Sequence, residues 1–179
     1  MDETQSKSGL WWLWISAIVV VLDQWTKQIA SSTLTLYQPV EVNSLLNWTL
    51  MHNEGVAFSI LADQSGWQRW FISVVAIAIV IWLLIWLKQN VFKMKLLNSG
   101  LAFVIGGALG NTYDRLQLGY VVDFIEAHYN DNYWPAFNIA DMAISFGAFL
   151  LIMDLIFSKP EPADKEKQHK KQKKSNNEN

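Results

Sequence analysis

Acidic side chains occur in this 179-residue chain inside or beside segments that are otherwise strongly apolar. Asp23 lies within the hydrophobic N-terminal part, and Asp141 stands near the start of a hydrophobic segment close to the other end. Ionisable residues in such segments are energetically costly and are usually functional. Sequence proximity favours ion pairs of Asp114 with Arg115 and of Asp23 with Lys27. Because Lys27 and Arg115 are the only basic residues expected near four or five acids, at least two carboxylates should lack a basic partner.

Two unpaired carboxylates that lie close together cannot both ionise easily, so one pKa rises and the pair shares a proton. Beside water, such a pair can hydrolyse a peptide bond. One carboxylate deprotonates the water, while the other, protonated, polarises the carbonyl group of the bond to be cut. The acids of this chain therefore indicate acid–base hydrolysis.

Other hydrolytic chemistries fit the sequence less well. A serine mechanism would need a base near Ser59 or Ser145, and no Ser/His pattern is evident. A metal site could use His52, His128 and Asp123, but the chain has no helical pair of histidines at the spacing that zinc enzymes use. The chain has no cysteine, which excludes thiol catalysis, disulfides and zinc sites built on thiolates.

Four apolar segments could position these side chains. They are Leu10–Ile29, Trp70–Leu87, Leu96–Asn111 and Ile139–Phe157. A membrane-spanning helix needs about 20 residues, and the third segment is the weakest because it is short and rich in glycine. Its small residues suit close helix packing. We therefore expect an all-α membrane protein with a four-helix transmembrane bundle.

The basic residues are unevenly distributed and predict the orientation of these spans. Lysines lie between the second and third segments and again after Phe157, whereas residues 29–67 and 117–137 contain no Lys or Arg. This pattern predicts that both termini are cytoplasmic. The polar residues then share one depth near the outer leaflet, and Asn53 and Asp123 are expected in the two outer loops. The full set is Asp23, Asn53, Asn111, Arg115, Asp123, Asn138 and Asp141.

The segments outside the spans differ in character. Val40–Val42 and Trp48–Met51 are typical of β-strands and predict a small sheet in the first outer loop. Residues 159–179 are Lys-rich and predict a disordered cytoplasmic tail, which leaves residues 1–158 as the membrane domain. Tryptophans cluster near both predicted interfaces, with Trp25, Trp67, Trp70 and Trp134 at the outer one.

Five short motifs in this order resemble the lipoprotein signal peptidase (signal peptidase II) family, over essentially Trp11 to Phe157. The motifs are Leu22-Asp23-Gln24 through Lys27, Asn53-Glu54-Gly55-Val56-Ala57-Phe58-Ser59, Gly106-Gly107-Ala108-Leu109-Gly110-Asn111 through Asp114-Arg115, Val121-Val122-Asp123-Phe124, and Phe137-Asn138-Ile139-Ala140-Asp141. Each motif alone is a weak signal. Together, on a four-span topology, they are specific.

The resemblance implies an aspartyl endopeptidase of the bacterial inner membrane, with a small extracytoplasmic β-cradle beside the bundle. Its substrates would be lipid-modified prolipoproteins, cut before a diacylglyceryl-modified cysteine. Asp123 and Asp141 would be the catalytic pair. The supporting and substrate-binding residues would be Asp23, Asn53, Gly107, Asn111, Arg115 and Asn138.

The resemblance also bears on ligands. No cofactor, metal or nucleic acid is expected, and the partners would be membrane lipids, the prolipoproteins and inhibitory cyclic peptide antibiotics. The alternative is a small membrane transporter or proton-relay protein that uses the same acids. Against it, the chain has no inverted repeat, and its acids cluster at one depth instead of lining a path across the bilayer.

Overall fold

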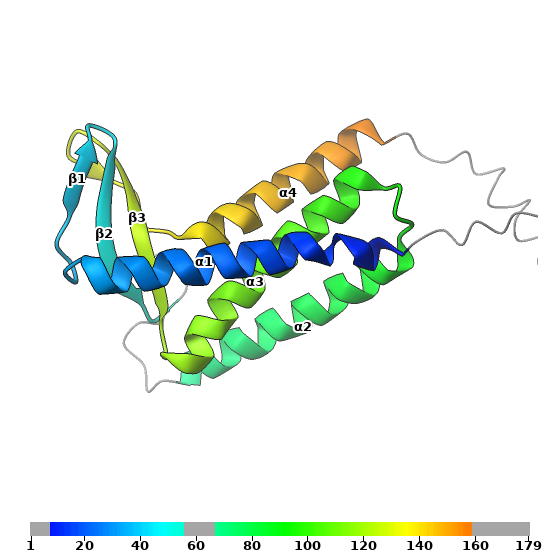
Figure 1. The fold of residues 1–179 in the computed structure, drawn as a ribbon, viewed down its shortest axis with the longest axis horizontal. Coiled ribbons are helices and arrows are strands. Elements are labelled where there is room, and N and C mark those ends of the chain that lie inside the picture. The colour runs from blue at the N-terminus through cyan, green and yellow to red at the C-terminus, as the bar shows by residue number, and fades with distance from the viewer. Residues whose placement is uncertain (1–7, 56–66, 159–179) are drawn as a thin grey trace, which may run out of the picture.

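The computed structural model describes residues 8–55 and 67–158. The residues that follow Gly55 in the second motif, Ser59 among them, lie outside the described residues, as does the predicted tail from residue 159. Four long helices and a sheet make up the described part (Figure 1). The helices pack into a bundle with α3 at its centre, and the sheet stands across one end of the bundle.

The four helices coincide with the four predicted apolar segments but extend beyond three of them. A 3₁₀ turn, η1 (Gly9–Trp12), leads into α1 (Leu13–Thr33), and α2 comprises Trp67–Gln89. Helix α3 (Lys95–Gln117) continues past Asn111, and α4 (Ile139–Phe157) has the predicted bounds. The extension of α3 is important because it carries Asp114 and Arg115, which the prediction placed at the outer end of this span.

By length and composition, three of the described helices are candidates for crossing a membrane: η1 with α1, α2, and α4. Helix α3 is as long as α2 but less apolar. The reason is its central place, since α3 packs against α1, α2 and α4. Twelve of its 23 residues are buried, Asn98 and Asp114 among them, so polar side chains there face protein instead of lipid.

The sheet has four antiparallel strands in the order β1-β2-β3-β4. Strands β1 (Val40–Asn43) and β2 (Leu46–Asn53) confirm the predicted sheet in the first loop. Strand β3 (Val121–Tyr129) was not predicted, and it pairs with β2 along most of its length and with the short β4 (Asn132–Tyr133). Asp123, expected in a loop, therefore lies on a strand opposite Met51.

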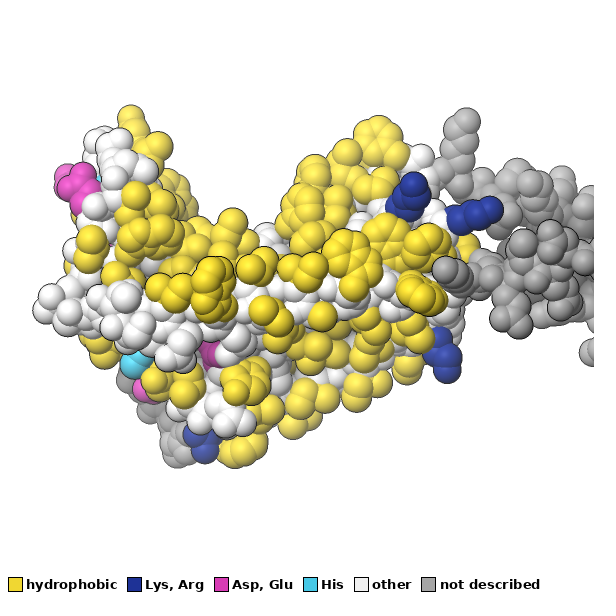
Figure 2. Space-filling view, in the orientation of Figure 1, with side chains coloured by type: hydrophobic (Ala, Val, Ile, Leu, Met, Phe, Trp, Pro, Cys, Tyr) yellow, Lys and Arg dark blue, Asp and Glu magenta, His cyan; other side chains and the backbone are white. Residues whose placement is uncertain are grey.

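The surface of the helix bundle is largely apolar. Figure 2 shows hydrophobic side chains covering the helices on the visible face. The exposed tryptophans include Trp11, Trp14, Trp25, Trp67, Trp70, Trp82 and Trp134. A large exposed apolar surface of this kind is unfavourable in water and suits contact with lipid. One hydrophobic core lies between α2 and α3, where Leu87 and Leu101 are fully buried.

Candidate active site

Glycines bring α1, α3 and α4 together at the point where the polar residues lie. A Cβ atom at Gly107 of α3 would collide with the carbonyl oxygen of Ala140 in α4. A Cβ atom at Gly110 would lie 2.6 Å from a carboxylate oxygen of Asp23 in α1. Only glycine allows these approaches, so Gly107 supports the site by helix packing.

Lys27 is the centre of a buried ion cluster between α1 and α3. Its ammonium lies 2.8 Å from Asp23 and 2.9 Å from Asp114, and it donates a third bond of 2.9 Å to Oδ1 of Asn111. All three side chains of the ion cluster are at most 3% exposed. The two acids also bind backbone amides, Asp23 that of Ala140 and Asp114 that of Val122. The ion cluster thereby ties α1 and α3 to α4 and β3.

Asp123 is held by amide side chains from two other elements. Nδ2 of Asn53, at the end of β2, donates to Oδ2 of Asp123 at 3.0 Å. Nδ2 of Asn138 donates to Oδ1 of Asp123 at 2.6 Å. Asp123 is 3% exposed, and Asn138 is fully buried.

Asp141 is built into the first turn of α4. Asn138 is the N-cap residue: its Oδ1 accepts from the amide of Asp141 at 3.0 Å, and its own amide donates to Oδ2 of Asp141 at 3.3 Å. This reciprocal arrangement is a capping box. Nδ2 of Asn111 donates to Oδ1 of Asp141 at 2.7 Å. Asn138 therefore contacts both Asp123 and Asp141, and its cap position fixes the acid at the start of the helix.

Asn111 connects the ion cluster to the acid pair formed by Asp123 and Asp141. Its Oδ1 accepts from Lys27 and, at 3.1 Å, from Asn138. An amide that accepts on one side presents its NH₂ group on the other, and here that group faces Asp141. The orientation of Asn111 is thus determined by the lysine.

The acid pair has no close cation. In residues 8–55 and 67–158, the ion pairs are the two made by Lys27. The guanidinium of Arg115 donates to the carbonyls of Asn111 and Gly55 at 3.4 and 3.5 Å. The charge of Arg115 acts on both acids, and that of Lys27 on Asp123, from a distance.

The surroundings of Asp123 change its proton affinity. Burial raises the pKa of Asp123 from 3.8 to about 6, and the negative charge of Asp141 adds to the rise. Hydrogen bonds from Asn53 and Asn138 oppose it. A carboxyl group with a pKa near 6 can take up and release a proton close to neutral pH, as acid–base catalysis requires.

The structure brings all eight sequence-predicted site residues into this one region. The histidines weighed as metal ligands have other contacts: the rings of His52 and His128 stack on Tyr120 and Tyr133. Asp154, near the opposite end of α4, bonds to Ser158. In the described ranges, no three His, Asp or Glu side chains gather closely enough to hold a metal ion.

Sequence reasoning missed two contributors to the site. Asp114 was expected to pair with its neighbour Arg115, but it pairs with Lys27. Lys27 was expected to pair with Asp23, which is confirmed, but its contact with Asn111 was not foreseen. The spacing of Asp23 and Lys27, one helical turn apart, was the only available signal.

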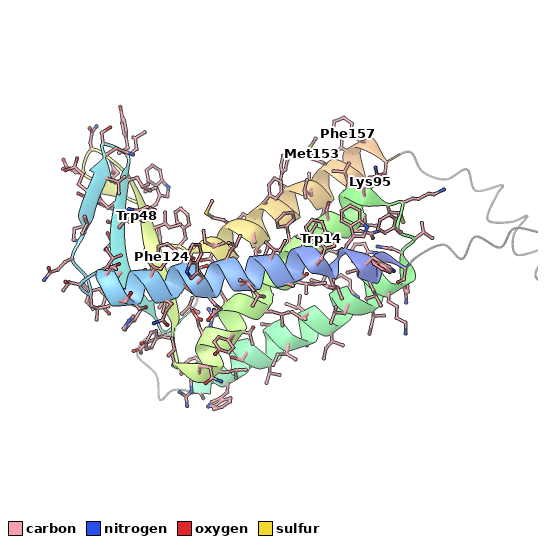
Figure 3. All side chains as sticks on the ribbon, viewed as in Figure 1. Trp14, Trp48, Lys95, Phe124, Met153 and Phe157 are labelled. Atoms are coloured by element: carbon pink, nitrogen blue, oxygen red, sulfur yellow. The ribbon has the colours of Figure 1, made fainter. Side chains whose placement is uncertain are left out.

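Two apolar grooves lie beside the site. One of about 420 Å³ separates α1 from α4, and Ile139 and Met142, which flank Asp141 in sequence, are in its wall. The other, about 240 Å³, lies between the end of α1 and the sheet. Figure 3 shows Trp48 and Phe124 on the side of the sheet that faces the helices, and Figure 2 shows the molecule hollowed between the sheet and the far end of α4.

Comparison with known proteins gives one consistent result. Residues 15–157 match the family model described as signal peptidase (SPase) II. A lipoprotein signal peptidase of Alteromonas mediterranea is 50% identical over 149 residues, which cover 83% of this chain and 82% of the relative. One from Pseudomonas aeruginosa is 48% identical over 161 residues, covering 89% and 95%.

Solved structures agree with the sequence relatives. A bacterial membrane enzyme determined by the in meso method at 1.9 Å resolution superposes with a TM-score of 0.73 at 31% identity, covering 83% of this chain and 94% of that one. A second such structure, at 2.3 Å resolution, gives a TM-score of 0.71 at 32% identity, with coverage of 85% and 93%.

Proposed function

The chain belongs to the signal peptidase II family, membrane aspartic peptidases that remove signal peptides from prolipoproteins, and we propose that Asp123 and Asp141 are its catalytic pair. The observation that supports this assignment is the shared contact with Asn138. Both carboxylates bind this one buried residue, and neither has an ion-pair partner in the described ranges. The alternative of a transporter or proton relay has no support among the relatives.

In the proposed mechanism the pair holds one proton, and burial favours Asp123 as its site. The ionised partner takes a proton from water as the water oxygen attacks the carbonyl carbon of the peptide bond. The protonated partner donates to the carbonyl oxygen. The pair then gives its proton to the leaving nitrogen as the C–N bond of the tetrahedral intermediate breaks. A hydroxyl group of the intermediate returns a proton to the pair as the new carboxyl group forms, so the pair again holds one proton.

The remaining polar residues position the pair and do not exchange protons with the substrate. Asn53 and Asn138 hold Asp123, while Asn111 holds Asp141. Amide donors stabilise a carboxylate without fixing its charge as a close cation does. Arg115 supplies positive charge that moderates the repulsion between two acids.

The substrate is proposed to reach the pair from the lipid. The groove between α1 and α4 is apolar, and its wall includes Ile139 and Met142 from the turn of α4 that carries Asp141, so it suits the hydrophobic signal sequence or the lipid chains. Cleavage would then fall before the diacylglyceryl-modified cysteine, and a cyclic peptide antibiotic would inhibit by occupying the same acids. The test compares lipidated and unlipidated precursors with the purified chain; equal rates would contradict a role for the lipid.

This multi-pass enzyme is further proposed to cross the bacterial inner membrane four times, with both termini cytoplasmic and the site near the outer leaflet. In support, α3 equals α2 in length, and Lys88, Lys93 and Lys95 lie at the end of the bundle away from the sheet. Single cysteines at Lys93 and Asn130 would be treated with an impermeant thiol reagent in spheroplasts. Labelling at residue 93 together with protection at residue 130 would contradict the proposed orientation and indicate the opposite one.

A further inference from the structure

A second cavity, of about 470 Å³, lies apart from the acid pair, where the start of α2 meets the turn that follows α3. Its walls combine aromatic rings with one positive and one negative side chain. The residues that matter are Glu54, Trp67, Arg69, Trp70, Gly119 and Tyr120. The proposed catalytic mechanism uses none of them.

Arg69 presents an available guanidinium in this cavity. The group lies over the ring of Trp70, 5.0 Å from its centre, which is a cation–π contact. In the described part of the chain, no carboxylate lies within ion-pair distance of Arg69 and no acceptor takes a hydrogen bond from it. Gly119, at a φ of +90°, leaves room for the guanidinium, because a Cβ atom there would lie 2.9 Å from Nη1 of Arg69.

Glu54 brings the opposite charge to the same cavity without reaching Arg69. It is exposed, and among the described residues it has no ion-pair partner. His52 lies close enough to interact with it, but burial lowers the pKa of His52, so this imidazole is mainly neutral at pH 7. The cavity therefore holds a separated positive and negative charge between aromatic rings.

We propose that this cavity binds the headgroup of an aminophospholipid, with the phosphate on Arg69 and the ammonium on Glu54. A zwitterionic ligand explains why two opposite charges line one cavity yet do not pair. The guanidinium fork matches phosphate oxygens. The exposed rings of Trp67 and Trp70 are of the kind that gathers at the headgroup level of a membrane. This inference does not rest on the proposed catalytic pair.

The experiment titrates the purified full-length chain, in detergent, with short-chain phosphatidylethanolamine or phosphatidylglycerol, and counts bound lipid by native mass spectrometry. Inorganic phosphate is titrated separately. The variants are Arg69→Gln, Glu54→Gln and, to displace the guanidinium without removing its charge, Gly119→Ala. Lys93→Gln is the matched control, because it removes one exposed positive charge at the opposite end of the bundle. The melting temperature without lipid checks that each variant is folded.

We expect the wild type to bind phosphatidylethanolamine more tightly than phosphatidylglycerol. Arg69→Gln should weaken both by about tenfold, as the loss of a charged hydrogen bond predicts, and Gly119→Ala should act in the same direction. Glu54→Gln should weaken phosphatidylethanolamine alone, and Lys93→Gln should match the wild type. Equal losses in Arg69→Gln and Lys93→Gln, no effect of Glu54→Gln, or inorganic phosphate binding as tightly as the lipid would each overturn the proposal.

Discussion

Two pairs of acids lie within one polar region of this molecule, and they are held in opposite ways. Asp23 and Asp114 share the ammonium of Lys27 at 2.8 and 2.9 Å. Asp123 and Asp141 bind asparagine amides instead. A buried lysine that bonds two carboxylates at once holds both of them in place by charge, whereas neutral amides leave a carboxylate without a balancing charge at bonding distance. The first pair is therefore suited to structure and the second to chemistry.

The largest effect should come from the second pair. Asp123→Asn or Asp141→Asn alone should lower kcat by at least about 10⁴-fold, and the double variant should be little worse, because both acids act in one step. Cleavage of lipidated precursor by purified variants measures this. Asp154→Asn, at the other end of α4, is the control and should retain activity. Substantial turnover by a folded single variant of the pair would refute the aspartic mechanism assigned here.

Loss of the lysine that Asp23 and Asp114 share should mainly lower the free energy of unfolding. Lys27→Met leaves two buried carboxylates without their cation and should reduce the free energy of unfolding by about 3–5 kcal/mol. Denaturant unfolding in a fixed detergent measures the change, with exposed Lys88→Met as the control.

The same experiment separates charge from packing. Adding Asp23→Asn and Asp114→Asn to Lys27→Met removes the unpaired charges and should restore most of the lost stability. If the triple variant remains as unstable as Lys27→Met, the lysine acts by packing and the contrast between the two pairs fails.

Asp123 should also make the stability of the folded chain depend on pH. The folded chain keeps a proton on Asp123 up to about pH 6, while the unfolded chain releases it near pH 3.8. Its contribution to stability is therefore present at low pH and is lost as the pH rises from about 4 to above 6, by roughly 3 kcal/mol. Unfolding of wild type and Asp123→Asn at several pH values measures the difference. Parallel curves would show that Asp123 does not hold the proton.

The smallest effect is expected at Arg115, the cation that acts on the acid pair without touching it. Arg115→Lys keeps the charge but loses the fork that reaches the carbonyls of Asn111 and Gly55. Both bonds are long, so a loss of about 1 kcal/mol in stability and a severalfold loss of activity are expected. A variant as active and stable as the wild type would leave Arg115 without a role.

How far the sequence predicted this structure depends on the range of the interactions involved. The helices followed from apolar segments, and β1 and β2 from local alternation, because these patterns are contained within each element. Strand β3 was missed although Val121–Tyr129 is rich in β-branched and aromatic residues; its pairing with β2 joins segments some 70 residues apart.

The sequence predicted which residues make up the site but not which of them bond to one another. The acids and amides could be grouped by depth, because the order of the helices determines which ends meet. The partner of Asp114 could not be predicted. Sequence proximity favoured its neighbour Arg115, whereas the rotation of α3 about its axis turns Asp114 toward Lys27. The role of Asn111 depends on the same rotation, since one amide must face a lysine and an aspartate at once.

The capping box at the start of α4 has a consequence for assembly. Asn138 and Asp141 satisfy each other's backbone amides only when the first turn of the helix is formed. The same two side chains are the link to Asn111 and Asp123. A chain in which this turn has not formed therefore has no joined acid pair, so hydrolytic competence should arise together with the docking of the last helix. Such coupling would protect an immature membrane protein from cutting at random, because the proposed catalytic pair is not assembled before the first turn of α4 has formed.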